Sequence, residues 1–317
     1  MRSIPQQIAA NKRASFFYSA LLVLLLIALG AAVVGAYDPK SVWLGAAGAG
    51  VAGIIAAVVA RYAGPQIVLG VSHARMATDL ERQTVENVAH EMAIASGMPM
   101  PQVYIIDDSA PNAFATGKDP QHGIICVSTG LLRMLNRDEL QGVVAHEMAH
   151  IRNYDIRLMT TLAMVAGIIP MISDMFWNSM RFGGMRRSRS NDDNDSSSGQ
   201  LQVVFFVLAL VLAILAPIFS TLIQLAVSRK REFLADSTAA LLTRNPEGLA
   251  SALQKLEANT ERLEAANHAT AHMFIVNPFK GQKVQNMMSN LTSTHPPTSE
   301  RIKALLGTYG VNSTLPE

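Results

Sequence analysis

Four long apolar runs constrain this chain more than any other feature of its sequence. They occupy residues 16–36, 42–60, 158–177 and 201–227. A helix of about 20 apolar residues is long enough to cross the hydrocarbon core of a bilayer. Half of the 317 residues are hydrophobic and only 16% are charged, so a wholly soluble fold is not expected. We therefore expect a protein held in a membrane by helices.

The first two runs predict a transmembrane hairpin over residues 1–61. Arg2, Lys12 and Arg13 precede the first run, as in a signal peptide, but the run is longer than a cleaved apolar region usually is. The second run is rich in Ala and Gly, which lets two helices pack closely in lipid. The basic residues before the first run, with Arg61 after the second, predict that both outer ends lie in the cytoplasm.

The last two runs, with the polar loop 179–200 between them, predict a second hydrophobic helical pair over residues 158–227. The loop contains several arginines, which is unexpected for a loop on the outer side of the membrane. Asp174 is also costly in lipid unless it is paired or lies at the interface. The alternative is a helical arm that lies against the bilayer or against partner chains.

The two remaining stretches, residues 62–157 and 228–317, predict the two parts of one catalytic domain. An amphipathic helix is expected over 77–96, and strands over 102–108 and 123–128. Asn136 and Glu139 form a capping-box pattern at the start of a further helix. The expected fold class is therefore mainly α (α+β), with integral membrane helices and a small β-sheet.

The pentapeptide HEMAH at residues 146–150 predicts a zinc site on that helix. Residues four apart lie on one face of an α-helix, so His146 and His150 can bind one ion together. Glu147 can then reach a water bound to the ion and act as its general base. One Zn²⁺ per chain is expected.

The sequence AHEMA occurs twice, at 89–93 and at 145–149, and the first copy serves as a comparison. Ile94 stands where the second copy has His150, so the first copy cannot chelate a metal. His268 and His272 are also four apart, but no Glu follows the first of them. Only the second AHEMA copy is expected to be a site.

A catalytic zinc needs a third protein ligand, and Glu232 is the best candidate. Asp236 lies one turn later on the same helix face and is expected to accept the free N–H of a ligand histidine, His146 for preference. A solvated acidic helix face has the same pattern and is the alternative. An antiparallel pair of helices over 158–227 would return this segment beside HEMAH, which favours the ligand role.

Four segments together resemble the HtpX family of bacterial membrane zinc proteases, relatives of the CAAX prenyl proteases. They are HEMAH, NAFATG at 112–117, SRKREFLAD from residue 228, and THPPTSERI at 294–302. The resemblance implies a gluzincin-type zinc metalloprotease domain with Glu232 as third ligand. It also implies a multi-pass protein of the bacterial inner membrane that degrades damaged or misassembled membrane proteins.

Further residues receive candidate roles with structural alternatives beside them. Asn112, Ala113, Phe114 and Ala115 are expected to form an edge strand that pairs with substrate, or else an ordinary hairpin strand with Phe114 in the core. In the resembling family's chemistry His295 would donate to the oxyanion as a catalytic residue, although a histidine before prolines is often only structural. Arg229 and Arg301 pair with site carboxylates, bind the oxyanion, or are solvated.

The predicted function is that of a membrane-anchored zinc endopeptidase facing the cytoplasm, with unfolded or damaged membrane proteins as substrates. The charged residues on both sides of HEMAH argue against a site inside the lipid bilayer. The alternatives are a CAAX-type prenyl-protein protease and a non-enzymatic zinc-binding or transport protein, but the four runs contain almost no metal-binding side chains. The net charge of +2 gives no reason to expect nucleic acid. The single Cys126 excludes an internal disulfide, and the oligomeric state is left open.

Overall fold

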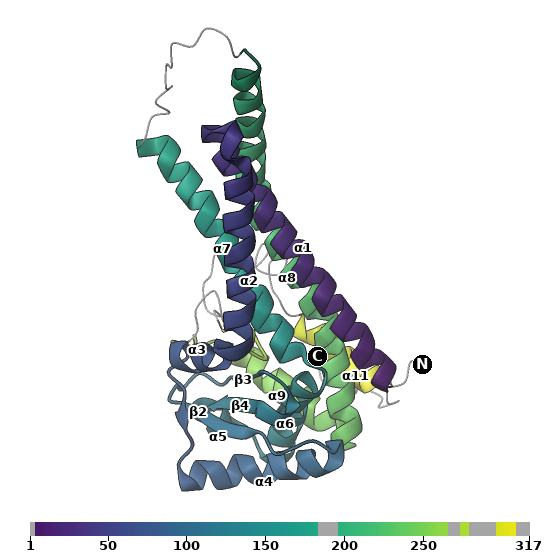
Figure 1. Ribbon diagram of the computed structural model, residues 1–317. Helices are drawn as coiled ribbons and strands as arrows, with labels where there is room; N and C mark the ends of the chain where they lie inside the picture. The colour runs from purple at the N-terminus through teal and green to yellow at the C-terminus, as the bar shows by residue number, and fades with distance from the viewer. Residues whose placement is uncertain (1–3, 183–195, 266–272, 279–295, 309–317) are drawn as a thin grey trace. The chain divides into compact units, whose positions relative to one another are not determined.

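The computed structural model describes residues 4–182, 196–265, 273–278 and 296–308 (Figure 1). The chain divides into two compact units. The first, called here the sheet unit, comprises Met1–Lys12, Arg61–Thr160 and Gln224–Glu317. The second, called the helical unit, comprises Arg13–Ala60 and Thr161–Ile223.

Four helices supply the helical unit, and each is long and apolar enough to cross a membrane. The candidate spans contain 22, 24, 27 and 25 residues, against about 20 needed for the hydrocarbon core. The expectation of membrane helices at all four apolar runs is therefore confirmed in length and composition. The helices are α1 (Ile4–Tyr37), α2 (Val42–Tyr62), α7 (Asp155–Phe182) and α8 (Ser196–Thr243).

Small residues bring α1 and α2 into backbone contact. A Cβ atom added at Gly30 would lie 2.7 Å from the carbonyl oxygen of Gly45 and 2.6 Å from the Cβ of Ala49. Only glycine permits this approach, because any side chain at position 30 would push α2 away. The Ala- and Gly-rich pattern therefore has its expected consequence, a tight helical hairpin.

Two polar contacts bring the end of this first hairpin to the second pair of helices. The hydroxyl groups of Tyr37 and Ser179 form a hydrogen bond. The side-chain amide of Gln202 donates to the carbonyl of Ala36 at 3.2 Å. The turn after α1 thus lies beside the end of α7 and the start of α8.

A four-stranded mixed sheet forms the centre of the sheet unit, in the order β1-β2-β4-β3. The pair β2–β4 is parallel, whereas β1–β2 and β3–β4 are antiparallel. The strand β3 therefore lies at one edge of the sheet. The strands are β1 (Arg75–Met76), β2 (Gln102–Ile106), β3 (Ala113–Gly117) and β4 (Gly123–Ser128).

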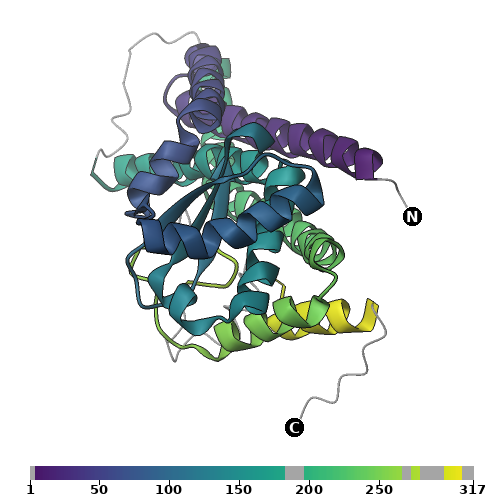
Figure 2. The same ribbon diagram turned by 90° about the horizontal axis from the view of Figure 1, so that it is seen from below.

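Helix α6 is the central helix of the sheet unit. It contacts strands β3 and β4 and packs against both α4 and α9, and α9 in turn packs against α11 (Figure 2). Its apolar residues, among them Val143, Val144 and Met148, are fully buried in the core. The helices around the sheet are α3 (Gly64–Val71), α4 (Asp79–Ser96), α5 (Thr129–Met134), α6 (Arg137–Arg152), α9 (Pro246–Ala258) and α11 (Thr298–Thr308).

The expected capping box fixes the start of α6. The side chain of Asn136 accepts from the backbone N–H of Glu139 at 2.9 Å, and the Glu139 carboxylate accepts from the N–H of Asn136 at 2.9 Å. The same carboxylate accepts hydrogen bonds from Ser251 and Lys255 on α9. One buried glutamate thus caps α6 and joins it to α9, which holds in place the helix that carries HEMAH.

Candidate metal centre

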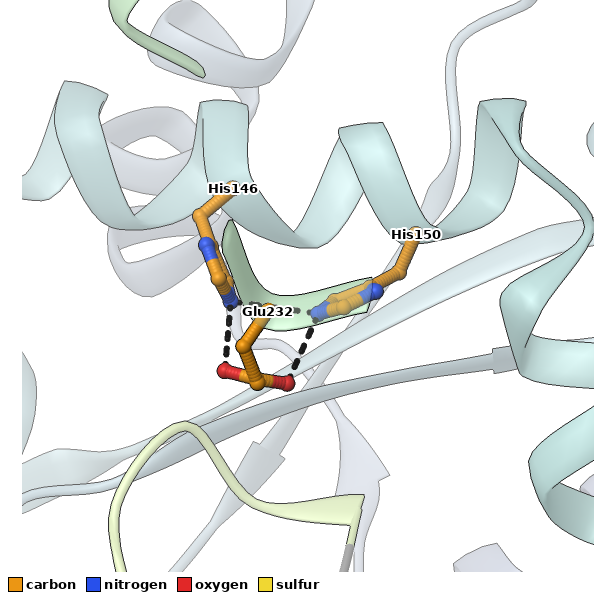
Figure 3. Close-up of side chains that lie close together, drawn as sticks. All are labelled: His146, His150 and Glu232. Atoms are coloured by element: carbon orange, nitrogen blue, oxygen red, sulfur yellow. Dashed lines mark hydrogen bonds and ion pairs between the residues drawn. The ribbon is translucent and has the colours of Figure 1, made fainter. Parts of the chain in front are cut away.

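Three side chains from two helices converge in the sheet unit (Figure 3). His146 and His150 come from α6, one turn apart, and Glu232 comes from α8. The Nε2 atoms of the histidines lie 3.1 Å apart. The Glu232 oxygens lie 3.6 Å from Nε2 of His146 and 3.4 Å from Nε2 of His150. The structure thus brings together the three predicted ligands.

These distances match the geometry of a zinc site. Ligand atoms around tetrahedral zinc lie about 3.3 Å apart when the bonds are 2.0–2.1 Å long. Two imidazoles and one carboxylate form the donor set of many catalytic zinc ions, which keep a further position for water. Next to the ligands, Oε1 of Glu147 is buried and has no hydrogen-bond partner among the described residues. The residues therefore fit Zn²⁺ with a general base beside it.

An aspartate holds the second nitrogen of each ligand histidine. Nδ1 of His146 lies 2.9 Å from Asp236, and Nδ1 of His150 lies 3.1 Å from Asp155. A carboxylate at Nδ1 keeps the proton there and leaves the Nε2 lone pair for a metal. The prediction paired Asp236 with His146 in this way. Asp155 was not predicted in this role, although its place five residues after His150, at the start of the next helix, is a usable signal.

Arg301 of α11 joins the two carboxylates of α8. It is only 1% exposed and binds Asp236 through Nε at 2.9 Å and Nη2 at 2.7 Å. Its Nη1 lies 3.1 Å from Glu232 and donates to the carbonyl of Ile275 at 3.0 Å. Of the alternatives for this arginine, pairing with site carboxylates is the one that the structure contains.

Burial and charge set the protonation of the centre in the absence of a metal. Burial, together with the nearby charge of Glu232, raises the pKa of Glu147 to about 8, although His150 and Arg301 oppose the rise. Burial also acts to raise the pKa of Asp236, but Arg301 outweighs it and holds that pKa below its ordinary value. A cation beside Glu147 would oppose the rise in its pKa, because it favours the ionised carboxylate.

The predicted substrate strand comprises residues 112–115. All four residues are buried rather than exposed at the surface. The backbone N–H of Ile275 donates to the carbonyl of Ala113 at 2.9 Å. The Asn112 side chain donates to the carbonyl of Val276 at 3.2 Å. The chain's own segment 273–276 therefore uses part of the β3 edge.

The other two residues of that strand differ in what they contact. The ring of Phe114 packs edge-on against Phe274 in the core, with centroids 5.1 Å apart. This agrees with the alternative of an ordinary hairpin strand with Phe114 in the core. The backbone N–H of Ala115 favours the ionised form of the Glu147 carboxylate, so β3 brings its edge close to the residue that is predicted as the general base. Pairing of a substrate with β3 stays a prediction.

Two other predictions have different outcomes. His295 lies outside the described residues, as do His268 and His272, so its catalytic role stays a prediction. In the first AHEMA copy, His90 is exposed to solvent. It takes no part in the cluster formed by the ligands.

Comparison with known proteins gives a family match over most of the chain. The model of peptidase family M48 matches residues 79–309. A protein named "Protease HtpX homolog" from Caldanaerobacter subterraneus subsp. tengcongensis is 50% identical over 222 residues, which are 70% of each chain. Proteins of the same name from Dictyoglomus thermophilum and Streptococcus gordonii are 42% and 41% identical, over 95% of this chain and 93% and 98% of theirs.

One solved structure also resembles the chain. The crystal structure of S. mikatae Ste24p aligns with a TM-score of 0.46 at 20% identity. The alignment covers 80% of this chain and 56% of that one.

Proposed function

This chain belongs to peptidase family M48, among the HtpX proteases, and from that premise we propose that it is a zinc endopeptidase acting at the cytoplasmic face of a bacterial membrane. It is a multi-pass bacterial membrane protein and a metalloprotease. The observation that carries the proposal is the convergence of His146, His150 and Glu232 beside the buried carboxylate of Glu147. His146, Glu147 and His150 lie within about one turn of α6, and Glu232 reaches them from α8.

The proposed mechanism assigns separate tasks to these side chains. Zinc, when bound, supplies a Lewis acid that polarises the peptide carbonyl and lowers the pKa of water. Glu147 takes the proton from the attacking water and passes it to the leaving amine. Asp236 and Arg301 keep His146 and Glu232 in place through the contacts described above. His295 is proposed as a donor to the oxyanion.

The substrate is proposed to lie along the edge of β3 in an extended form. Extended peptides pair with an open sheet edge through backbone hydrogen bonds, which suits an enzyme acting on unfolded chains. Because Ile275 already bonds to Ala113, the pairing is proposed for the part of the edge from Ala115 to Gly117. Ala115 also lies next to Glu147, so a peptide there would be close to the base.

The proposed substrates are damaged or unfolded membrane proteins, and the proposed side is the cytoplasm. The basic residues around the first hairpin support this orientation. The name of the HtpX relatives supports proteolysis but names no substrate. A CAAX-type prenyl-protein protease is the alternative within the same chemistry.

A zinc transporter is less well supported. Among the residues that the structure describes, the one group able to hold a metal lies outside all four candidate spans. A transport site would be expected within the spans, near the middle of the bilayer.

The test uses purified full-length protein and an unfolded membrane protein as substrate. Glu147→Gln should keep its zinc and lose cleavage, because the amide cannot accept the proton of water. Glu91→Gln is the matched control, since Glu91 occupies the same place in the first AHEMA copy, and it should cleave normally. Zinc-loaded Glu147→Gln protein that cleaves at the normal rate would overturn the mechanism. Glu232→Ala should lose zinc, and unchanged affinity would remove Glu232 from the ligand set.

A further inference from the structure

A buried aspartate and arginine form a chain of contacts behind His150. Nδ1 of His150 lies 3.1 Å from Oδ2 of Asp155, and the other oxygen of Asp155 accepts from Nη1 of Arg231. Asp155 is 1% exposed and Arg231 is 6% exposed. Burying two charges is costly unless they are paired with good geometry, so this pair requires an explanation.

The backbone between α6 and α7 is shaped to bring Asp155 to this position. Tyr154, between His150 and Asp155 in the chain, has φ 61, the left-handed conformation that non-glycine residues seldom adopt. Such strain persists where the surrounding structure fixes it and often occurs at functional sites. Asp155 then starts α7, where the N-terminal dipole of the helix favours a carboxylate. The strained turn directs the aspartate back towards the end of the helix that it follows.

Arg231 directly precedes the predicted ligand Glu232 in α8, and this position determines which way its side chain points. Successive residues of an α-helix point about 100° apart, so Glu232 can face the metal while Arg231 faces Asp155. Asp236, one turn after Glu232, binds the other ligand histidine. A single stretch of α8 therefore reaches both histidines. Asp236 contacts His146 directly, whereas Arg231 reaches His150 through Asp155.

We propose that Asp155 and Arg231 are positioning residues for the zinc ligand His150, in a His–Asp–Arg arrangement that matches His146, Asp236 and Arg301. This inference rests on the proposed zinc site. Asp155 orients the imidazole through Nδ1, and Arg231 orients Asp155. In the His146 arrangement, Arg301 also contacts Glu232, so that arrangement reaches the third predicted ligand as well.

The same pair relates His150 to two long helices of the chain. Asp155 is the first residue of α7 and Arg231 lies within α8, and both helices also contain a candidate membrane span. The orientation of His150 therefore depends on how the start of α7 and the 231 region of α8 approach each other. Without this pair, His150 would lose the contact at Nδ1 that helps to fix the orientation of its ring.

The test measures metal binding by the full-length protein rather than proteolysis. Zinc affinity is measured by competition with a chelator, and the visible absorption of the Co²⁺-loaded protein reports the geometry of the ligands. Asp155→Asn should lower zinc affinity about 10–100-fold, the range usual for residues that orient metal ligands, and should change the cobalt spectrum. Arg231→Gln should do the same. The zinc affinity of the double variant should equal that of the single variant with the lower affinity, because both residues act through His150.

A matched control and a conservative variant make the result specific. Asp119→Asn removes a carboxylate 2.6 Å from Nδ1 of His122, an exposed His–Asp pair distant from the ligand set in sequence, and should leave zinc affinity unchanged. Arg231→Lys, which keeps the charge, should recover part of the affinity lost in Arg231→Gln. If Asp155→Asn does not fold, Asp155→Glu keeps the charge and should still weaken zinc binding by displacing His150.

Two results would overturn the inference. One is normal zinc affinity with an unchanged cobalt spectrum in Asp155→Asn or, where that variant fails to fold, in Asp155→Glu. The other is a lower melting temperature of the metal-free protein without any loss of zinc affinity, which would make the pair structural only. Wild-type protein that binds zinc but cleaves nothing would instead refute the proposed function, and the zinc and cobalt measurements would still decide the role of Asp155.

Discussion

Helices α4 and α6 contain the same five residues, AHEMA, and pack against each other, yet they have different surroundings. In α4, His90 faces solvent and Glu91 binds Arg137 and Gln141 on the neighbouring helix. In α6, the matching His146 and Glu147 are both 1% exposed. The same peptide thus forms part of a surface contact in one helix and part of the candidate metal site in the other.

The chemistry of the second copy depends on residues outside the pentapeptide. The residue after the pentapeptide differs, since Ile94 is 71% exposed whereas His150 is held by Asp155. Among the residues that the structure describes, carboxylates of α8 and an arginine of α11 contact the second copy. The pentapeptide supplies donor atoms, and the rest of the fold provides the burial and the partners that make those atoms a site.

The largest effect is expected from exchanging the residue that distinguishes the two copies. His150→Ile, which copies α4 into α6, should lower zinc affinity and proteolysis by at least about 1,000-fold, because a ligand is lost. The reciprocal Ile94→His should gain no zinc, because the one possible metal-binding group among the described residues is the one on α6 and α8. Metal analysis of both purified proteins checks this pair, and a second zinc per chain in Ile94→His would contradict the comparison.

A smaller effect is expected when His146 loses its carboxylate partner, Asp236. Asp236→Asn should lower zinc affinity about 10–100-fold, since the amide holds Nδ1–H more weakly and removes one of the two carboxylates that pair with Arg301. Chelator competition measures the change. An affinity equal to that of the wild type would show that the imidazole is oriented by packing alone.

Each of the two helices begins with its own capping box. Losing the box should reduce the free energy of unfolding more in α6 than in α4. Glu139→Gln should lower the free energy of unfolding by about 1–3 kcal/mol, because Glu139 is buried and also binds α9. Glu81→Gln, in the box that begins at Thr78, should cost less than about 1 kcal/mol. Thermal or denaturant unfolding of the full-length protein compares the two variants.

The effect of Glu139 should depend on pH in a defined direction. Burial acts to raise the pKa of Glu139, but hydrogen bonds from Lys255, Ser251 and Asn136 outweigh it and hold the pKa below its ordinary value of 4.5. A depressed folded-state pKa gives stability that is present above 4.5 and is lost as the pH falls through the folded value. The difference between wild type and Glu139→Gln should therefore shrink below pH 4.5, and a constant difference would exclude this origin.

The smallest effect is expected at Glu91. The carboxylate is 40% exposed in its pair with Arg137, so Glu91→Gln should change the free energy of unfolding by less than about 0.5 kcal/mol. Zinc affinity should not change. A loss of zinc in this variant would show that α4 contributes to the site after all.

Much of the fold and of the ligand set could be predicted because local patterns carry the information. The spans follow from the length of the apolar runs, and the pair His146 and His150 follows from helical spacing. The strands at 102–106 and 123–128 were recognisable as apolar segments bounded by turns. Glu232 needed one further step, the return of the chain after the second helical pair.

Other features could not be predicted because they depend on residues distant in sequence. Nothing near Asp155 in the sequence indicates that Arg231 will meet it, 76 positions later. The β3 edge looked open to substrate until Ile275 was seen to bond to Ala113. The short helix α3, begun by Pro65, was not recognised, since eight residues are too few for a clear helical period.

The contact between Arg301 and the carboxylates of α8 also has a consequence for the order of synthesis. The ribosome makes Arg301 65 positions after Asp236 and 155 positions after His146. At about 5–20 residues per second, the later interval alone lasts roughly 3–13 seconds. Throughout that time the nascent chain already holds all three predicted ligands but lacks the arginine that joins Glu232 to Asp236. Such a chain lacks Arg301 beside the predicted ligands until α11 has been made.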